Sequence, residues 1–320
     1  MALHQASGRW RLGLAMALLT AFSWATLPVA LKITLEQLDP YTLTWFRFLV
    51  AALCMLAWVG ARRGFGVFRG LGAPRWTMLL VAALGLIGNY VFYLLGVQHT
   101  TPGNAQLLIQ LAPLLMALGG IFVFKENYKP LQWAGLGVIV LGLLLFFREQ
   151  LAHAVSGRDY AMGSSLVLVA AVVWALYALL QKQLLVRLDS PSIQLFIYAL
   201  AAIVLLPLAQ PRALLALDAR HAWLLAFCSI NTLVAYGAFA EALAHWQASR
   251  VSAVLAVTPL LSLATIAILH SLSPASIAAE SVGVAGYAGA VLVVVGSAMC
   301  SLLGNPRPAP PVAEANAETA

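Results

Sequence analysis

Long apolar stretches alternate with short polar ones along almost the whole chain. An α-helix needs about 20 mostly apolar residues to cross the hydrocarbon core of a bilayer. We expect such helices, within a few residues at each end, at 11–31, 41–60, 76–97, 104–124, 130–148, 163–183, 192–209, 222–242, 251–270 and 281–302. The connecting segments are short, so the pattern predicts an all-α polytopic membrane protein with ten transmembrane helices.

Composition supports this fold class and excludes several others. Hydrophobic residues make up 62% of the chain and charged residues only 9%, against about 25% charged residues in soluble domains. The net charge of +7 comes from basic residues scattered over short loops, so no nucleic-acid surface is expected. The three cysteines lie in apolar runs without CxxC spacing, which indicates neither a disulfide framework nor a zinc site. The Pro-, Ala- and Glu-rich segment 304–320 is predicted to be a disordered cytoplasmic tail.

Basic residues in the connecting segments predict the orientation of the chain, because Lys and Arg are retained on the cytoplasmic side. With the N-terminus inside, the outer basic residues are Lys32, Arg148, Arg158, Arg212 and Arg220. The inner ones outnumber them and are Arg9, Arg11, Arg62, Arg63, Arg69, Arg75, Lys125, Lys129, Lys182, Arg187, Arg250 and Arg307. We therefore expect a multi-pass protein of the inner (plasma) membrane with both termini in the cytoplasm.

The two halves of the chain carry the same landmarks in the same order. SWATLPVALK in the first half aligns with VWALYALLQK in the second, which pairs Trp24 with Trp174. LAPLL aligns with VTPLL, which pairs Pro113 with Pro259. A five-helix unit crosses the membrane an odd number of times, so its copy is inverted, as in many secondary transporters. We predict two inverted five-helix repeats, at 1–150 and 160–303.

Further motifs follow these landmarks in a fixed order. Trp24, Lys32, Pro40 and Arg47 are followed by LAPLLMALGGIFVFKE, which ends at Glu126, and then by LQWAGLGVIVLG, VTPLLSLATIAIL and the glycine-rich VGVAGYAGAVLVVVG. The set resembles the drug/metabolite transporter superfamily, in its ten-helix EamA-like branch, over about residues 12–302. The resemblance implies solute transport through a ten-helix fold. In one departure, LHSLSPAS follows the ninth helix where the family often has an acidic residue, so no symmetric pair of carboxylates is predicted.

Arg47 lies inside an apolar run, TLTWFRFLVAAL, at a rise of roughly 10 Å from Pro40 along the predicted helix. A charge within the membrane is costly and usually faces a cavity or a partner. The resemblance also places an arginine at this position. Two roles stay open: Arg47 braces neighbouring carbonyl groups or extends to the head groups, or it contacts the substrate or a gate.

Polar and aromatic side chains share single faces of several predicted helices. In the sixth helix, Trp174, Tyr177 and Gln181 follow the spacing of one face. Such faces are expected to point inward because a polar side chain is costly in lipid, although tryptophans also pack between helices. The residues predicted to line a substrate cavity are Trp24, Arg47, Asn89, Tyr90, Tyr93, Gln106, Gln110, Trp174, Tyr177, Gln181 and Ser262.

Prolines and glycines suggest where helices bend and approach. Pro113 and Pro259 lie within predicted helices, where each removes a backbone hydrogen bond. Three roles stay open: the kinks act as hinges, they widen a cavity, or they are inherited packing kinks. The glycines of the fifth and tenth helices favour close helix packing, and a homodimer contact is the alternative.

Few carboxylates lie near membrane depth. Glu241, in FAEALAHW, is the candidate for a proton-coupling group, with His245 one turn further on. This i, i+4 spacing equally suits two interfacial residues in water. Glu126 is expected to form a structural ion pair with Lys125 or Lys129.

These features favour a secondary transporter that exports small organic metabolites, such as amino acids or their analogues, or drugs, by alternating access. The expected partners are a small-molecule substrate and the lipid bilayer. The chain has no GxxxxGK phosphate loop, so direct ATP hydrolysis by this chain is not expected. A membrane-embedded enzyme is one alternative, but the six histidines are dispersed without HExxH spacing, so we predict no catalytic residue, metal or cofactor. A non-transporting scaffold is the other alternative, against which the polar faces argue.

Overall fold

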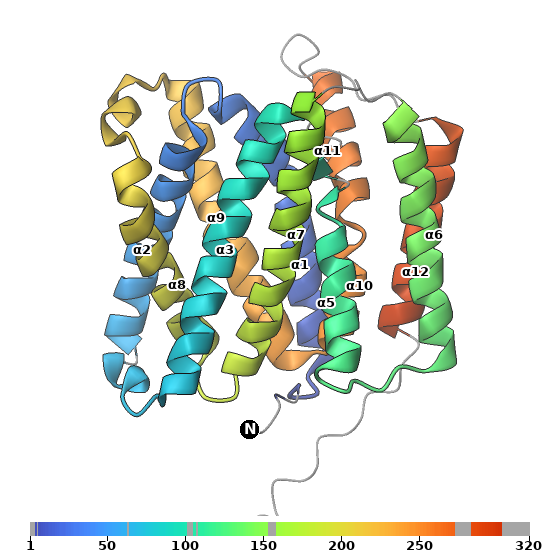
Figure 1. The fold of residues 1–320 in the computed structure, drawn as a ribbon, viewed down its shortest axis with the longest axis horizontal. Coiled ribbons are helices and arrows are strands. Elements are labelled where there is room, and N and C mark those ends of the chain that lie inside the picture. Colours follow the sequence, from blue (N-terminus) through green and yellow to red (C-terminus); the bar gives the residue numbers. More distant parts are fainter. Residues whose placement is uncertain are drawn as a thin grey trace, which may run out of the picture.

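The fold is a bundle of helices that run roughly parallel to one another (Figure 1). The computed structural model describes residues 4, 6–62, 64–100, 105–106, 108–152, 158–272 and 283–302, and this part of the chain contains no strand. Three short 3₁₀ helices are η1 (Phe65–Phe68), η2 (Leu206–Leu208) and η3 (Pro211–Ala216). The α-helices are α1 (Trp10–Thr34), α2 (Pro40–Arg62), α3 (Ala73–His99), α5 (Leu111–Phe122), α6 (Pro130–Ala152), α7 (Arg158–Leu184), α8 (Ser190–Leu205), α9 (Ala219–His245), α10 (Ala248–Leu255), α11 (Thr258–Leu272) and α12 (Val284–Leu302).

Apolar helices in the described part of the chain coincide with the ten predicted segments. Those long and apolar enough to cross a membrane are Trp10–Thr34, Pro40–Arg62, Ala73–His99, Ala161–Leu184, Ser190–Leu208, Ala219–His245 and Ala248–Leu272. Shorter apolar helices are Leu111–Phe122, Pro130–Leu145 and Val284–Cys300. The prediction of an all-α polytopic membrane protein is confirmed.

Two predicted helices are interrupted rather than continuous. The fourth, 104–124, contains a turn at 109–110 before α5 begins, and the ninth, 251–270, divides at 256–257 into α10 and α11. Each break lies shortly before Pro113 or Pro259. A proline leaves the carbonyl four residues earlier without its helical partner. The Ile109 carbonyl instead accepts a hydrogen bond from the N–H of Ala112, three residues later, at 2.9 Å. The hinge role of the two prolines stays a prediction.

Helices of the first half pair crosswise with helices of the second half. α1 packs against α9 while α3 packs against α7, and the remaining pairs are α2 with α8, α5 with α10 and α6 with α12. Asn231 of α9 donates to the Ser23 carbonyl of α1 at 2.7 Å, and Asn89 of α3 donates to the Ala170 carbonyl of α7 at 3.0 Å. Exchanging the halves therefore reproduces the same contacts, as inverted repeats require. The boundaries 1–150 and 160–303 stay predictions, and the tail 304–320 lies outside the described residues.

Glycines permit the close contact between α6 and α12, which lie side by side at one end of the bundle (Figure 1). A Cβ added at Gly142 of α6 would lie 2.6 Å from the Gly289 carbonyl oxygen, and one at Gly296 would lie 2.6 Å from that of Gly135. These glycines thus serve packing within the chain. A homodimer stays a prediction.

Candidate functional site

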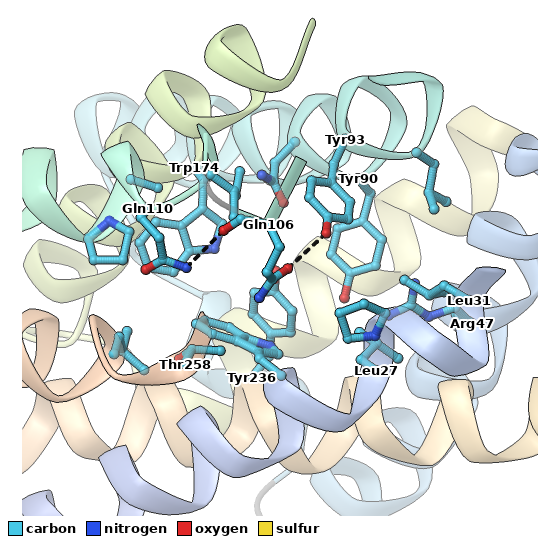
Figure 2. A pocket seen from close by; sticks show the side chains of 18 residues that line it. Leu27, Leu31, Arg47, Tyr90, Tyr93, Gln106, Gln110, Trp174, Tyr236 and Thr258 are labelled. Carbon is cyan, nitrogen blue, oxygen red and sulfur yellow. Dashed lines mark hydrogen bonds between the residues drawn. The ribbon is translucent and has the colours of Figure 1, made fainter. Parts of the chain in front are cut away.

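A cavity of about 120 Å³ lies between the central helices. In α1 the lining residues belong to the second half of the helix, and α2 contributes Arg47 from near its start, so the cavity lies toward the side of the bundle opposite the N-terminus. Figure 2 shows aromatic and amide side chains gathered around it. The lining residues are Trp24, Leu27, Pro28, Leu31, Arg47, Asn89, Tyr90, Tyr93, Leu94, Gln106, Ile109, Gln110, Ala112, Pro113, Trp174, Tyr236, Leu255 and Thr258.

Arg47 is 2% exposed and is held by neighbours on two other helices. Its Nε donates to Thr232 Oγ1 at 2.9 Å and to the Cys228 carbonyl at 3.3 Å, both on α9. Its guanidinium carbon lies 4.7 Å from the centroid of the Tyr90 ring on α3. A desolvated cation–π contact contributes about 2 kcal/mol, whereas burying a charge costs several kcal/mol. The ring contact and the hydrogen bonds each offset some of the cost of burying the guanidinium.

A contiguous group of aromatic rings forms one wall of the cavity. The Trp24 ring lies 5.5 Å from that of Trp174 and 5.3 Å from that of Tyr236, both in edge-on geometry. Tyr236 in turn lies 5.7 Å from Tyr90. Trp24 and Trp174, which the repeat alignment pairs, thus meet at the centre of the molecule. The wall presents flat apolar surface at mid-depth.

Amide and hydroxyl groups form a second wall. The Tyr93 hydroxyl donates to Gln106 Oε1 at 3.0 Å, and the Gln106 amide donates to Ser262 Oγ at 3.4 Å (Figure 2 shows the first contact). Gln110 donates from Nε2 to the Gln106 carbonyl at 3.2 Å. The Ser262 hydroxyl donates onward to the Ala25 carbonyl at 3.1 Å. Polar groups are thus fixed beside the cavity by helices from both halves.

The side of the bundle nearest the N-terminus is held together by Glu126, which follows α5. Its carboxylate is 2.7 Å from the Lys182 ammonium at the end of α7, and both side chains are almost fully buried. It also accepts hydrogen bonds from the backbone N–H groups of Ala248 and Ser249 at 2.8 and 3.0 Å. These N–H groups open α10, where a helix terminus favours an anion. We call Glu126, Lys182 and Ser249 the Glu126 cluster.

Electrostatics keeps this cluster ionised. Burial raises the pKa of the Glu126 carboxyl, but the Lys182 ammonium and the hydrogen bonds from Lys182 and Ser249 outweigh burial. The pKa therefore lies below the usual value for a glutamate. The expected partner was wrong: Glu126 pairs with Lys182 rather than with its sequence neighbours Lys125 and Lys129. The lysine lies 56 positions along the chain, so local spacing gave no signal for it.

The structure brings together most, but not all, of the residues predicted to line a cavity. Those that line it are Trp24, Arg47, Asn89, Tyr90, Tyr93, Gln106, Gln110 and Trp174. Tyr177, Gln181 and Ser262 do not line it. Tyr177 is buried where α7 approaches Gly85 of α3, and its hydroxyl accepts a hydrogen bond from Gln194 at 3.3 Å. Ser262 lies behind Gln106 as its hydrogen-bond partner.

Glu241 lies outside the cavity. Its side chain is 42% exposed, and its carboxylate is 3.4 Å from His245 at the end of α9 nearest the N-terminus. His245 Nδ1 also contacts the Ser7 hydroxyl at 2.7 Å. Two partly exposed groups on one helix turn match the interfacial alternative. A proton-coupling role for Glu241 stays a prediction.

Several lining residues were not predicted. Tyr236 was missed, although its aromatic ring lies within an apolar helix one turn after Thr232, a polar position that the same pattern could have revealed. Leu27, Leu31 and Leu94 gave no signal, because an apolar side chain facing a cavity resembles one facing lipid. Among the described residues, no group of three or more His, Cys, Asp or Glu is placed to hold a metal ion.

Comparisons with known proteins agree with this architecture. A solved crystal structure superposes with a TM-score of 0.69 at 20% identity, covering 93% of this chain and 98% of its own, which establishes the shared fold. The "Uncharacterized inner membrane transporter YhbE" of Escherichia coli (strain K12) is 38% identical over 92% of this chain and 92% of its own length. The "Probable amino-acid metabolite efflux pump" of Salmonella typhimurium is 25% identical over 88% of this chain and 92% of its own length.

The family comparison covers both halves of the chain. The sequence model of the EamA-like transporter family matches residues 11–148 and again residues 161–302. Each match spans one set of helices, α1 to α6 and then α7 to α12. Together with the apolar helices, these matches make the chain a multi-pass membrane protein, and it belongs to the EamA-like transporter family.

Proposed function

We propose that this chain is a secondary transporter that exports small organic metabolites across the inner membrane by alternating access. The observation that carries the proposal is the central cavity, lined by helices of both crosswise-paired halves. Inverted repeats meeting at a midplane site are the common architecture of secondary transporters. A membrane scaffold would have no need to keep polar groups such as Gln106 and Gln110 around an unfilled space.

Alternating access requires a side that is closed while the other is open. The cavity lies on the side opposite the N-terminus, while the Glu126 cluster joins α5, α7 and α10 on the N-terminal side. Opening a path to the N-terminal side requires these contacts to separate. α10 and α11 are already divided at 256–257, so the segment bonded to Glu126 can tilt without bending a continuous helix.

The size of the cavity favours a metabolite over a drug. An engineered protein cavity of about 150 Å³ holds one benzene molecule, and sites for drug-sized ligands measure about 300–1,000 Å³. The cavity here, about 120 Å³, is close to the first volume and well below the second, which suits a small metabolite. Export, rather than uptake, is supported by the relative from Salmonella typhimurium whose printed name is an amino-acid metabolite efflux pump.

An untargeted comparison of culture medium tests the proposal. Cells that overproduce the chain should release at least one small metabolite that control cells retain. Trp174→Ala, which removes a lining ring, should abolish that release at equal membrane abundance. Leu176→Ala on the same helix, with a side chain 44% exposed on the bundle surface, is the matched control and should export normally. An unchanged metabolite profile, or full export by Trp174→Ala, would contradict the proposal.

A further inference from the structure

Arg47 is a buried cation whose terminal nitrogens have no protein partner among the described residues. The hydrogen bonds to Thr232 and Cys228 both use Nε. No hydrogen bond joins Nη1 or Nη2 to a described residue, and the side chain lines the cavity while being only 2% exposed. Figure 2 shows Arg47 beside Leu31 at one end of the cavity, with Gln110 and Trp174 at the other.

The described carboxylates do not supply a counter-ion. No ion pair within 4 Å joins Arg47 to any described Asp or Glu. Glu126 is taken by Lys182, Glu241 by His245, and Asp218 by His221. Of the lining residues that the structure describes, none is acidic and Arg47 alone carries a formal charge. The cavity is therefore electropositive at the Arg47 end.

A guanidinium whose two terminal nitrogens are both unused can bind a two-oxygen anion in a bidentate way. We infer that Arg47 is the substrate-anchoring residue and that the exported solute carries a carboxylate bound at its Nη atoms. This inference rests on the proposed transport function. A buried charge is stabilised only by a partner, so an anion entering the cavity relieves the unpaired state of Arg47. A cationic solute would be repelled there.

The rest of the cavity defines the body of such a solute. Away from Arg47, the aromatic wall of Trp24, Trp174 and Tyr236 offers flat apolar faces. Gln106 and Gln110 add amide groups beside that wall. A solute with a carboxylate at one end and a small flat apolar or weakly polar group at the other matches these groups in their order along the cavity.

Binding to the purified full chain tests the inference independently of transport. Phenylacetate and phenylacetamide have nearly the same size and shape, and only the first carries a carboxylate. Calorimetric titration of the chain in lipid nanodiscs should show phenylacetate binding at millimolar concentrations or tighter, at least about tenfold more tightly than the amide. Equal affinities, or no binding of phenylacetate, would overturn the inference. Equally tight binding of inorganic phosphate would overturn the assignment to a carboxylate.

Variants locate the site. Arg47→Gln keeps a donor of similar reach for Thr232 but removes the charge, and should reduce the tenfold preference to about parity. Lys32→Gln removes an exposed cation one residue beyond the lining residue Leu31 and should keep the preference. Retained preference in a folded Arg47→Gln protein, or its loss in Lys32→Gln, would contradict the assignment. The comparison of the two ligands in the unchanged protein needs no variant to fold.

The medium comparison separates failure of this inference from failure of the transport proposal. If cells export a metabolite whose release needs Trp174 but not Arg47, the transport proposal is supported and the role of Arg47 in binding a carboxylate is contradicted. If phenylacetate binds through Arg47 but no metabolite is exported, the binding site stands and the transport proposal falls.

Discussion

A single arginine can serve both packing and recognition because its nitrogens point in different directions. Nε of Arg47 ties α2 to α9 through Thr232 and the Cys228 carbonyl, while Tyr90 covers one face of the guanidinium. These contacts fix the side chain and leave the terminal nitrogens at the cavity. The two roles that the sequence leaves open are therefore compatible in one residue, the first observed and the second proposed.

Glu241 is the candidate proton-coupling residue from the sequence, and its surroundings favour the interfacial alternative. It is partly exposed at the end of α9, and its contact with His245 is screened by solvent. We expect Glu241→Gln to change protein stability by less than about 1 kcal/mol and to leave export of the identified metabolite within about twofold of the unchanged protein. Export measured across a range of external pH would show a coupling role if the variant lost its pH dependence together with its activity.

Cavity-lining residues can be predicted from the sequence where a polar side chain interrupts an apolar helix. Asn89, Gln106 and Arg47 stand out within apolar helices, and all three line the cavity. Tyr177 shares a helical face with Trp174, but it is buried against α3 because Gly85 lets the backbones approach. Such a contact depends on a glycine 92 positions away in the sequence, and no pattern within one helix contains that information.

At the scale of elements, the Glu126 cluster joins three segments through one carboxylate. Removing only one partner of a buried ion pair typically costs 3–5 kcal/mol, because the other charge stays buried without compensation. Lys182→Met should therefore destabilise the purified protein by about that amount in thermal unfolding. The double variant Glu126→Gln/Lys182→Met should recover a large part of the loss. Additive losses would show that the two side chains stabilise the bundle independently.

The same cluster predicts how stability responds to acid. The pKa of Glu126 in the folded protein is lower than in the unfolded chain. Its contribution is therefore fully present at neutral pH and is lost as the pH falls through the lowered pKa. The unfolding temperature should fall more steeply below about pH 4.5 in the unchanged protein than in Glu126→Gln. Parallel pH profiles would contradict the ionised pair.

The contact between α6 and α12 depends on glycines at particular positions. Gly142→Ala places a Cβ within 2.6 Å of the Gly289 carbonyl, so backbone must move. Overpacking of this kind costs about 1–3 kcal/mol. Gly137→Ala, on the same helix with no neighbour within 4 Å, is the matched control and should be neutral or stabilising. Thermal unfolding of both variants checks this, and equal losses would contradict the packing argument.

The existence of the helices follows from apolar length alone, whereas their interruptions do not. Every predicted segment corresponds to an apolar helix, but the breaks at 109–110 and 256–257 precede Pro113 and Pro259. The proline in the sequence indicates that the helix is disturbed. The residue at which the helix breaks depends on which backbone carbonyl forms a different hydrogen bond. At Ile109 that partner is the Ala112 N–H, a choice made by local backbone geometry.

At the scale of the whole molecule, contacts place both ends of the described chain on one side of the bundle. The Ser7 N–H donates to the Ala244 carbonyl at 3.2 Å, near the start of α10, which binds Glu126. Gln132, near the start of α6, donates to the Cys300 carbonyl near the end of α12 at 2.8 Å. An even number of crossings follows from this arrangement, as the ten predicted helices require.

Orientation in the membrane then decides which compartment the cavity side of the bundle faces. The basic residues of the connecting segments predict that the N-terminal side is cytoplasmic, which would turn the cavity away from the cytoplasm and put the Glu126 cluster on the cytoplasmic side. Reporter fusions at Gly157 and Gly304, both outside the described residues, should report opposite sides, with Gly304 in the cytoplasm. Reporters on the same side would defeat the ten-helix topology. Opposite sides in the reverse sense would keep the fold but place the cavity toward the cytoplasm and the Glu126 cluster toward the exterior.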